Sequence, residues 1–316
     1  MTVAPSEVPS ELTGSANNLL SITAYSVLMV IAACGNLTVF ITLFRNRHRK
    51  SRVNLFIMHL SIADLVVTFI MLPLEIAWHT TVAWIAGDVA CRILMFWRTF
   101  GFYLSSFILI AISLDRYFAI TRPMSLSDAD RRGKLMLILA WLFSIVASSP
   151  QSVIYHVESH PNHPWFKQCV TFNFFPTTTH QMIYNVFCFS ALYLAPLVVI
   201  VISYSFILIE ITKRSREGRG GDTNSMIAST GSLRRSGVGR MEKARIRTLK
   251  MTIVIVFVFV MCWTPYYAMI IWHWVDKTSA EQVDEKIQRI LYLFAVSNSC
   301  MNPIVYGKDE FALSYL

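Results

Sequence analysis

The sequence predicts an all-α fold, a bundle of seven transmembrane helices. Of its 316 residues, 54% are hydrophobic and only 15% are charged, whereas about a quarter of the residues in a soluble domain are charged. The apolar residues form long runs, and about twenty apolar residues cross a bilayer core as a helix. The runs are too long for strands and do not alternate with polar residues, so helices are favoured. They cover 20–44, 54–78, 91–120, 134–154, 182–211, 249–274 and 287–306.

Each of the first four runs contains residues that stand out from its apolar background. The first contains Gly35-Asn36, and the second has Asp64 near its middle. In the third, the triplet Asp115-Arg116-Tyr117 follows the apolar stretch Phe96–Leu114, and the fourth contains Trp141. Because charges at a membrane edge are costly to place, the triplet is a candidate contact for a soluble partner.

The last three runs each contain a proline, which removes an amide donor and kinks a helix. The fifth has Pro196, the sixth has Cys262-Trp-Thr-Pro265, and the seventh has Asn302-Pro303-Ile-Val-Tyr306. Asn302 and Tyr306 are four residues apart and share one helix face. Each kink could serve packing alone, but three together suit a bundle whose inner halves can swing.

The basic residues predict the orientation, because cytoplasmic linkers are rich in Lys and Arg. The linker 45–52 has five basic residues and the linker 213–250 has eleven, whereas residues 1–18 have none. We therefore expect an extracellular N-terminus and a cytoplasmic C-terminus. The predicted parts are an extracellular tail (1–18), a seven-helix domain (19–306) with a disordered cytoplasmic loop at about 215–240, and a short cytoplasmic tail (307–316). The first run is expected to act as a signal anchor.

Asp64 is the carboxylate that lies deepest in a predicted span, which makes it a candidate functional residue. Its expected partners are polar residues predicted near the same depth: Asn36, Ser105, Asn298, Ser299 and Asn302. One carboxylate with hydroxyl and amide oxygens suits a hard cation such as Na⁺. A protonated aspartic acid in a polar core is the alternative, and the residues alone leave both open.

Two of the six cysteines are predicted to face the oxidising side of the membrane. Cys91 begins the third run and Cys169 lies in the long outer linker, so a disulfide is expected between them. It would tie the linker over the mouth of the bundle.

Other protein classes fit the sequence poorly. The basic segments lack the interleaved aromatic residues of a nucleic-acid-binding module. There is no phosphate-binding loop, zinc-binding His-Glu-x-x-His helix or nucleophile elbow, so no enzyme is expected. A transporter or channel that uses Asp64 as an ion relay is the alternative from another class, but no internal repeat supports it.

The motifs named above, in this order and with at least one in every span, resemble the rhodopsin-like (class A) G-protein-coupled receptors across essentially the whole chain. The resemblance implies a multi-pass protein of the plasma membrane that contacts lipid and signals to a heterotrimeric G protein. It implies that Asp115 holds Arg116 at rest and that Arg116, Pro123 and Met124 contact the G protein. It also implies an allosteric sodium site at the Asp64 cluster and no other cofactor. The implied activation switch comprises Asp115, Arg116, Tyr117, Tyr204, Trp263, Pro265, Asn302, Pro303 and Tyr306.

One departure from the receptor pattern concerns Arg116. Arg245 stands near the inner end of the sixth run, where some family members have an acid. The restraint on Arg116 is therefore expected to rest on Asp115 alone.

The pocket positions implied by the resemblance favour a peptide ligand. Arg98 stands where amine receptors have an aspartate, and Val296 stands where opsins have the retinal lysine. The expected ligand-binding residues combine aromatic rings with a carboxylate and a guanidinium: Glu75, Arg98, Tyr184, Asn185, Tyr266, Tyr267, Trp272, His273 and Tyr292. Two alternatives remain: Glu75 and Arg98 could simply pair with each other, and Trp272 and His273 could be interfacial anchors. Arg98→Ala is expected to weaken agonist potency without loss of surface expression.

The segments Phe96–Ser106 and Ser113–Pro123 look most like the gonadotropin-releasing hormone, adipokinetic hormone and corazonin receptor group. Asp64 with Asn302 matches invertebrate adipokinetic hormone receptors, whereas mammalian gonadotropin-releasing hormone receptors exchange these residue types. The resemblance implies a short peptide hormone blocked at both ends, and a Gq-type or Gs-type output. Corazonin-like, gonadotropin-releasing-hormone-like and vasopressin/oxytocin-like peptides are the alternatives.

Overall fold

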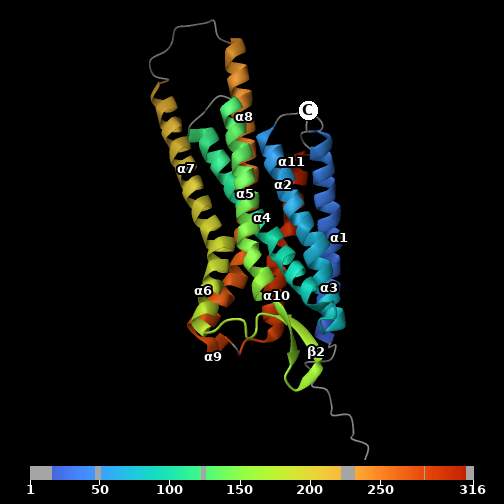
Figure 1. Ribbon diagram of the computed structural model, residues 1–316. Helices are drawn as coiled ribbons and strands as arrows, with labels where there is room; N and C mark the ends of the chain where they lie inside the picture. The colour runs from blue at the N-terminus through green and yellow to red at the C-terminus, as the bar shows by residue number, and fades with distance from the viewer. Residues whose placement is uncertain (1–15, 47–50, 122–125, 222–231, 281, 311–316) are drawn as a thin grey trace, which may run out of the picture.

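Seven helical crossings lie side by side in the part of the chain that the computed structural model describes, residues 16–46, 51–121, 126–221, 232–280 and 282–310 (Figure 1). Every predicted run falls within one of them. The crossings are α1 (Ala16–Arg45); α2, η2 and α3 (Arg52–Val66, Val67–Met71 and Leu72–Thr81); α4 (Gly87–Thr121); α5 (Leu126–Ile154); α6, η3 and α7 (Thr178–Phe189, Ser190–Leu194 and Ala195–Gly221); α8 (Ser232–Val275); and α10 with α11 (Glu285–Val296 and Asn298–Glu310).

The second and fifth crossings each contain a single π-helical turn, η2 and η3. Pro73 and Pro196 follow these turns as the second residues of α3 and α7. Proline has no amide hydrogen and its ring crowds the preceding turn. The wider π turn accommodates it and keeps the crossing continuous.

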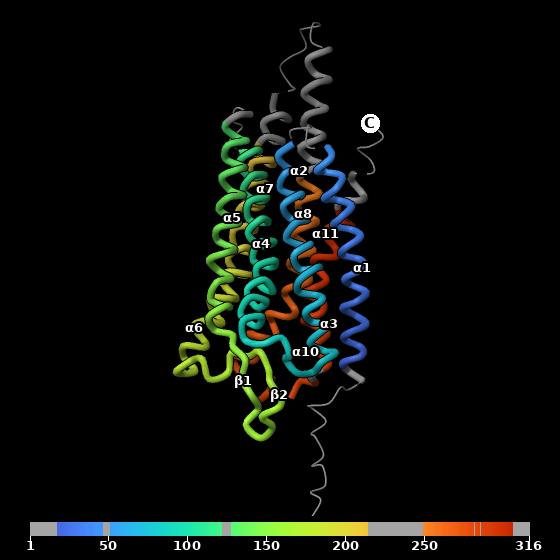
Figure 2. The backbone as a smooth tube through the Cα atoms, turned by 45° about the vertical axis from the view of Figure 1, so that its right-hand side comes forward, coloured from blue at the N-terminus to red at the C-terminus, as the bar shows by residue number. Residues whose placement is uncertain are grey.

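The seventh crossing is divided at Ser297 into α10 and α11, of 12 and 13 residues. The other six crossings are each long and apolar enough to span a membrane, judged over the described residues. The polar sequence Ser297-Asn-Ser299 and the proline at position 303 account for the interruption of the seventh. Its two halves lie end to end on the same side of the bundle (Figure 2).

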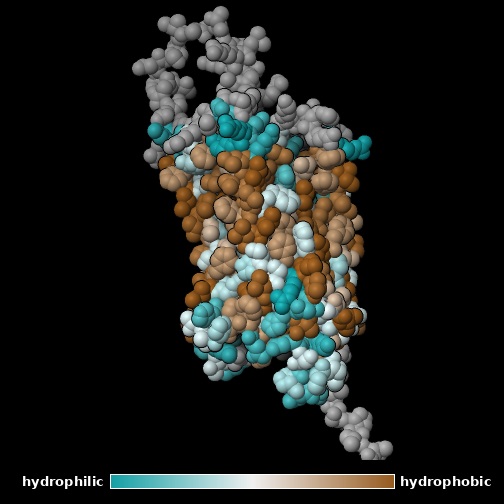
Figure 3. All heavy atoms as spheres, viewed as in Figure 1, coloured by the Kyte–Doolittle hydropathy of each residue, from teal (hydrophilic) through white to brown (hydrophobic). Residues whose placement is uncertain are grey.

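α4 occupies the middle of the bundle and contacts α2, α5, α7 and α8, as the tube view shows (Figure 2). One apolar core cluster extends through the bundle around it, and includes Phe100, Leu104 and Ile108. The outward faces are also apolar: Phe257 is 61% exposed and Leu208 is 60% exposed. Figure 3 shows a largely hydrophobic band between two more hydrophilic ends, as expected for a surface in contact with lipid.

Two glycines permit close helix contacts in the core. A Cβ atom on Gly35 would lie 2.8 Å from Cβ of Pro303, and a Cβ atom on Gly101 would lie 2.8 Å from Cγ2 of Val67. Any side chain at these positions would therefore push α1 from α11, or α4 from η2. Both contacts lie beside the polar residues at mid-bundle, so they fix the spacing of the helices that carry them.

A two-stranded antiparallel hairpin covers one end of the bundle, which we call the hairpin end. Its strands are β1 (His156–His160) and β2 (His163–Val170), and Val157 is paired with Cys169. The short helix α9 (Lys277–Ala280) lies at the same end (Figure 1). α1 begins at the hairpin end, and α11 ends at the opposite end, which we call the Arg116 end.

The helices α7 and α8 enter the segment that the sequence predicted as a disordered loop at about 215–240. α7 continues to Gly221 and α8 begins at Ser232. The prediction missed these extensions because it gave the Gly and Ser content more weight than the Arg and Glu residues that favour helix. Residues 222–231 lie outside the described part.

Candidate functional site

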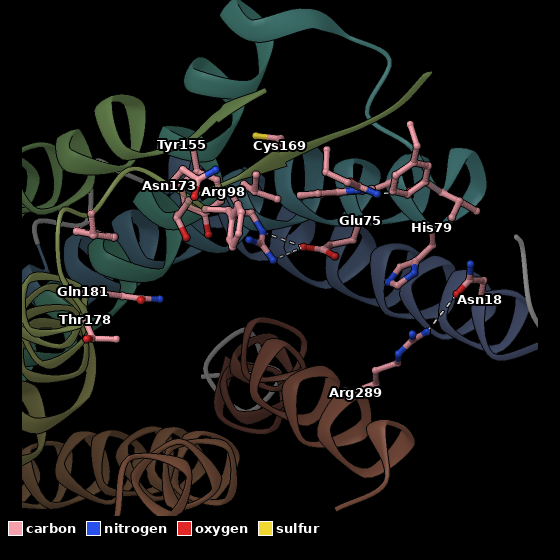
Figure 4. Close-up of a pocket in the computed structure, with 18 of the residues that line it drawn as sticks. Asn18, Glu75, His79, Arg98, Tyr155, Cys169, Asn173, Thr178, Gln181 and Arg289 are labelled. Atoms are coloured by element: carbon pink, nitrogen blue, oxygen red, sulfur yellow. Dashed lines mark hydrogen bonds and ion pairs between the residues drawn. The ribbon is translucent and has the colours of Figure 1, made fainter. Parts of the chain in front are cut away.

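Two adjoining cavities open at the hairpin end, with volumes of about 850 and 520 Å³. Tyr155, Thr171, Phe175 and Gln181 line both, so the cavities form one continuous site. The larger lies between α3, α4 and the hairpin, and the smaller lies among α6, α8 and α10. Figure 4 shows the larger cavity with side chains from these elements pointing into it.

Glu75 and Arg98 form a salt bridge at the inner side of the larger cavity (Figure 4). Nη2 of Arg98 lies 2.6 Å from Oε1 of Glu75, and Nε donates a second hydrogen bond to the same oxygen at 2.8 Å. Nη2 of Arg98 also donates to the hydroxyl of Tyr292 at 3.2 Å. Glu75 is only 6% exposed. The pairing left open by the sequence therefore exists, and it neutralises both charges inside the cavity.

A continuous set of aromatic rings extends inward from the cavities. The ring of Tyr292 lies 5.5 Å from that of Tyr266, which lies 5.4 Å from that of Tyr267. Tyr267 in turn stacks on Trp263 at 5.8 Å. Trp263 is 3% exposed and contacts Phe102 on α4 edge to face. A change in the cavity can therefore reach the core through directly packed rings.

The smaller cavity gathers five of the residues expected from the sequence. They are Tyr184, Asn185, Tyr266, Tyr267 and His273. The amide of Gln151 on α5 hydrogen-bonds the hydroxyl of Tyr184, which orients that ring.

Trp272 lines neither cavity and is 44% exposed, which agrees with the alternative of an interfacial anchor. Trp274 lines the smaller cavity instead and packs edge to face on Phe189 at 5.8 Å. Two residues along a helix turn the side chain through about 200°, so Trp272 and Trp274 lie on different faces of α8 and Trp274 is the one that lines the cavity.

Several residues of the larger cavity were not predicted from the sequence. Gln168 on β2 accepts a hydrogen bond from Nε1 of Trp78 at 2.8 Å and donates to the carbonyl of Val82 at 2.6 Å. Val82 has φ 59°, a region that β-branched residues rarely adopt. Arg289 on α10 donates to Asn18 on α1 at 3.1 Å (Figure 4). No local pattern marks these residues, because each depends on a partner far away in the chain.

The polar cluster at mid-bundle contains the residues expected around Asp64. Asp64 is fully buried, and its Oδ2 accepts a hydrogen bond from Nδ2 of Asn302 at 2.8 Å. Among the described residues, Oδ1 of Asp64, Oγ of Ser105 and Oδ1 of Asn298 are buried without a hydrogen bond. Ser299 is also buried. Oxygens that lack donors in this way can hold a cation, and the donor set therefore fits Na⁺.

The Arg116 end contains the charged triplet. Arg116 is paired with Asp115, as expected from the sequence. Tyr117 packs against Phe206 on α7, with ring centroids 5.9 Å apart, and Tyr204 packs on the apolar core. Pro265 and Pro303 lie inside α8 and α11. Four predicted features lie outside what the structure describes: Pro123, Met124 and the side chains of Tyr306 and Arg245.

The fold and these sites define a class of protein, a seven-helix membrane receptor with an open cavity at one end and a buried charged triplet at the other. The sequence profile described as 7 transmembrane receptor (rhodopsin family) matches residues 35–306. The chain therefore belongs to the rhodopsin family of seven-transmembrane receptors, and it is not an enzyme. The family confirms the predicted multi-pass location in the plasma membrane, and the disulfide between Cys91 and Cys169 is confirmed as well.

The chain is similar to several receptors within this family. It is 38% identical over 288 residues to the gonadotropin-releasing hormone II receptor of Clarias gariepinus, and the aligned region covers 90% of this chain and 74% of that receptor. It is 34% identical over 298 residues to the gonadotropin-releasing hormone receptor of Sus scrofa, and the aligned region covers 91% of this chain and 88% of that receptor. The predicted resemblance to the gonadotropin-releasing hormone, adipokinetic hormone and corazonin receptor group is thereby confirmed.

Proposed function

We propose that this protein is the receptor for a short peptide hormone of the adipokinetic hormone type, blocked at both ends. The observation that carries the proposal is the neutralised pair of Glu75 and Arg98 inside a cavity lined mainly by aromatic, amide and hydroxyl side chains, in which Arg289 is hydrogen-bonded to Asn18. A ligand without terminal charges needs stacking surfaces and hydrogen bonds more than a free counter-ion. The relatives named above are receptors for gonadotropin-releasing hormone, which supports a peptide as the ligand class.

The hairpin end is the side on which we propose that the peptide arrives. The Cys91–Cys169 disulfide lies at this end, and disulfides persist in oxidising compartments. α1 ends with Arg45 and α2 begins with Arg52 at the Arg116 end, and the sequence between them is basic, in agreement with the positive-inside rule. A hormone arriving from outside the cell would then meet the open cavities directly.

Signalling requires that the peptide bind one conformation more tightly than the other. The aromatic contacts from Tyr292 to Trp263 connect the cavity with the core. We infer that peptide binding shifts these rings and favours an outward position of the inner part of α8. The Arg116 end would then be open to a heterotrimeric G protein of the Gq or Gs type.

The proposal is tested with cells that express the receptor and a panel of adipokinetic, corazonin, gonadotropin-releasing and vasopressin/oxytocin-like peptides. Calcium and cyclic AMP are recorded in parallel. We expect the strongest response to a doubly blocked adipokinetic peptide and a weaker one to the same peptide with a free C-terminal acid. Biogenic amines serve as the negative control. Silence toward every peptide would refute the ligand class, and a stronger response to another peptide of the panel would reassign the hormone.

We also propose that the cluster around Asp64 holds a sodium ion that stabilises the resting state. Asp64→Asn removes the one carboxylate of the cluster, so sodium should no longer lower agonist affinity. The measurement is competition binding in sodium chloride and in choline chloride at equal ionic strength. An exposed aspartate variant, Asp276→Asn, is the matched control and should keep the sodium effect of the wild type. A sodium effect that persists in Asp64→Asn would contradict the assignment.

A further inference from the structure

Asp115 is shared by two guanidinium groups at the Arg116 end. Its Oδ2 is paired with Arg116, and its Oδ1 accepts a hydrogen bond from Nη1 of Arg52 at 2.7 Å. The two cations bind different oxygens, so neither displaces the other. Asp115 is fully buried, whereas the side chain of Arg52 is 20% exposed.

Arg52 belongs to a different part of the bundle from the helix expected to move. It is the first residue of α2, and its Nε lies 3.5 Å from Oδ1 of Asp130 on α5. The contact therefore joins α2, α4 and α5, and among the described side chains no residue of α8 forms an ion pair with Arg52 or Asp115. An outward movement of α8 would leave the contact between Arg52 and Asp115 in place.

Besides Arg116, Arg52 is the cation that hydrogen-bonds Asp115 among the described residues, and Arg132 interacts with the same carboxylate electrostatically. The guanidinium of Arg132 lies 4.2 Å from the ring centroid of Phe118, where it makes a cation–π contact. Asp130 is 43% exposed and is a second anion for Arg52, which it meets through Nε rather than Nη1. Lys134 lines the same small cleft as Arg52 and Asp130.

Removing one partner from a buried ion pair leaves an uncompensated charge, which strongly disfavours the resulting state. When Arg116 turns toward a G protein, Asp115 would be left in that condition if it had no other partner. We propose that Arg52 is a positioning residue that keeps the charge of Asp115 compensated while Arg116 is released. Arg52 thereby favours the signalling conformation. This inference rests on the proposed function, because it assumes that Arg116 leaves Asp115 during signalling.

The test is a double-mutant cycle on Arg52 and Asp115, measured as signalling per receptor at the cell surface. Arg52→Gln should lower basal signalling and agonist potency by about tenfold, within the usual range of coupling between sites. Arg52→Lys keeps the charge and should retain most of both. In the Asp115→Asn background the carboxylate is already neutral, so adding Arg52→Gln should change neither quantity.

The matched control is Arg92→Gln, at the other end of α4. Arg92 forms an exposed ion pair with Asp88, and exposed pairs contribute little. Its basal signalling should equal that of the wild type.

Two results would overturn the inference: unchanged or higher signalling in Arg52→Gln, or the same loss in the Asp115→Asn background, which would show a purely structural role. If Arg52→Gln does not reach the cell surface, the variant Asp130→Asn tests the inference instead. It removes the second anion that shares the charge of Arg52 and should raise basal signalling, whereas an unchanged or lower value contradicts the inference. Failure of the proposed function looks different, because the wild type itself would then not respond to any peptide.

Discussion

Replacing Cys91 and Cys169 together by alanine should destabilise the receptor by about 4.5 kcal/mol and abolish high-affinity peptide binding. The disulfide joins residues that are 78 positions apart, and closing a loop of that length removes about this much free energy of chain entropy from the unfolded state. Both sulfurs are buried in a satellite core cluster with Leu74, Trp84 and Met95. The substitution therefore destabilises the receptor in two ways: the unfolded chain gains conformational entropy, and the folded core loses packing contacts.

The same substitution would remove the cover of the larger cavity. Phe166, Gln168 and Val170 of β2 line that cavity, and the disulfide ties β2 to the start of α4. The measurements are thermal unfolding of the purified receptor in detergent and saturation binding of a labelled peptide. Cys34→Ala, at an exposed free thiol, is the matched control. Wild-type affinity in the double variant would show that the hairpin keeps its place without the bond.

Arg98→Ala is expected to lower both surface expression and peptide potency. The free energy of unfolding should fall by about 3–5 kcal/mol. The substitution leaves Glu75 buried at 6% exposure with neither of the two hydrogen bonds that Arg98 donates to it. Tyr292 also loses its donor. The sequence alone suggested that expression would survive this change, and the burial of Glu75 is the reason to revise that expectation.

A double variant separates the folding effect from the binding effect. Glu75→Gln with Arg98→Gln removes both charges, so no buried ion is left unpaired, and expression should recover. Peptide potency should remain low, because the donors presented to the cavity are changed. The measurements are flow cytometry of a surface epitope and calcium mobilisation. Full expression of Arg98→Ala alone would mean that water in the cavity solvates Glu75, against the cost expected from its burial.

The crossings could be predicted from the sequence because burial in lipid imposes a local condition. Every backbone amide within the hydrocarbon must be hydrogen-bonded inside its own helix. An apolar run such as 91–120 therefore predicts a helix without information from any other segment. The divided seventh crossing and the π turns were not predicted. They reflect how the chain adjusts around Pro73, Pro196 and the polar segment 297–299, and such adjustments depend on the neighbouring helices.

The candidate site was predicted in part. Glu75, Arg98 and the tyrosines were expected at the cavity, but whether Glu75 and Arg98 paired was open until the distance between α3 and α4 was known. The sequence selected Trp272 where the structure places Trp274. Which face of the kinked helix α8 turns toward the cavity depends on its packing against the neighbouring helices, and the apolar pattern does not determine it.

The amino-acid sequence by itself determined the class of architecture, the identity of the charged triplet and the cysteine pair, because each follows from lipid solvation, charge asymmetry or redox compartment. Only the tertiary structure showed that Arg52, in addition to Arg116, binds Asp115. Arg52 and Asp115 are 63 residues apart in the chain, and no local pattern relates them. Their contact arises because α2 and α4 pack together at the Arg116 end, where a fully buried carboxylate requires a partner for each oxygen.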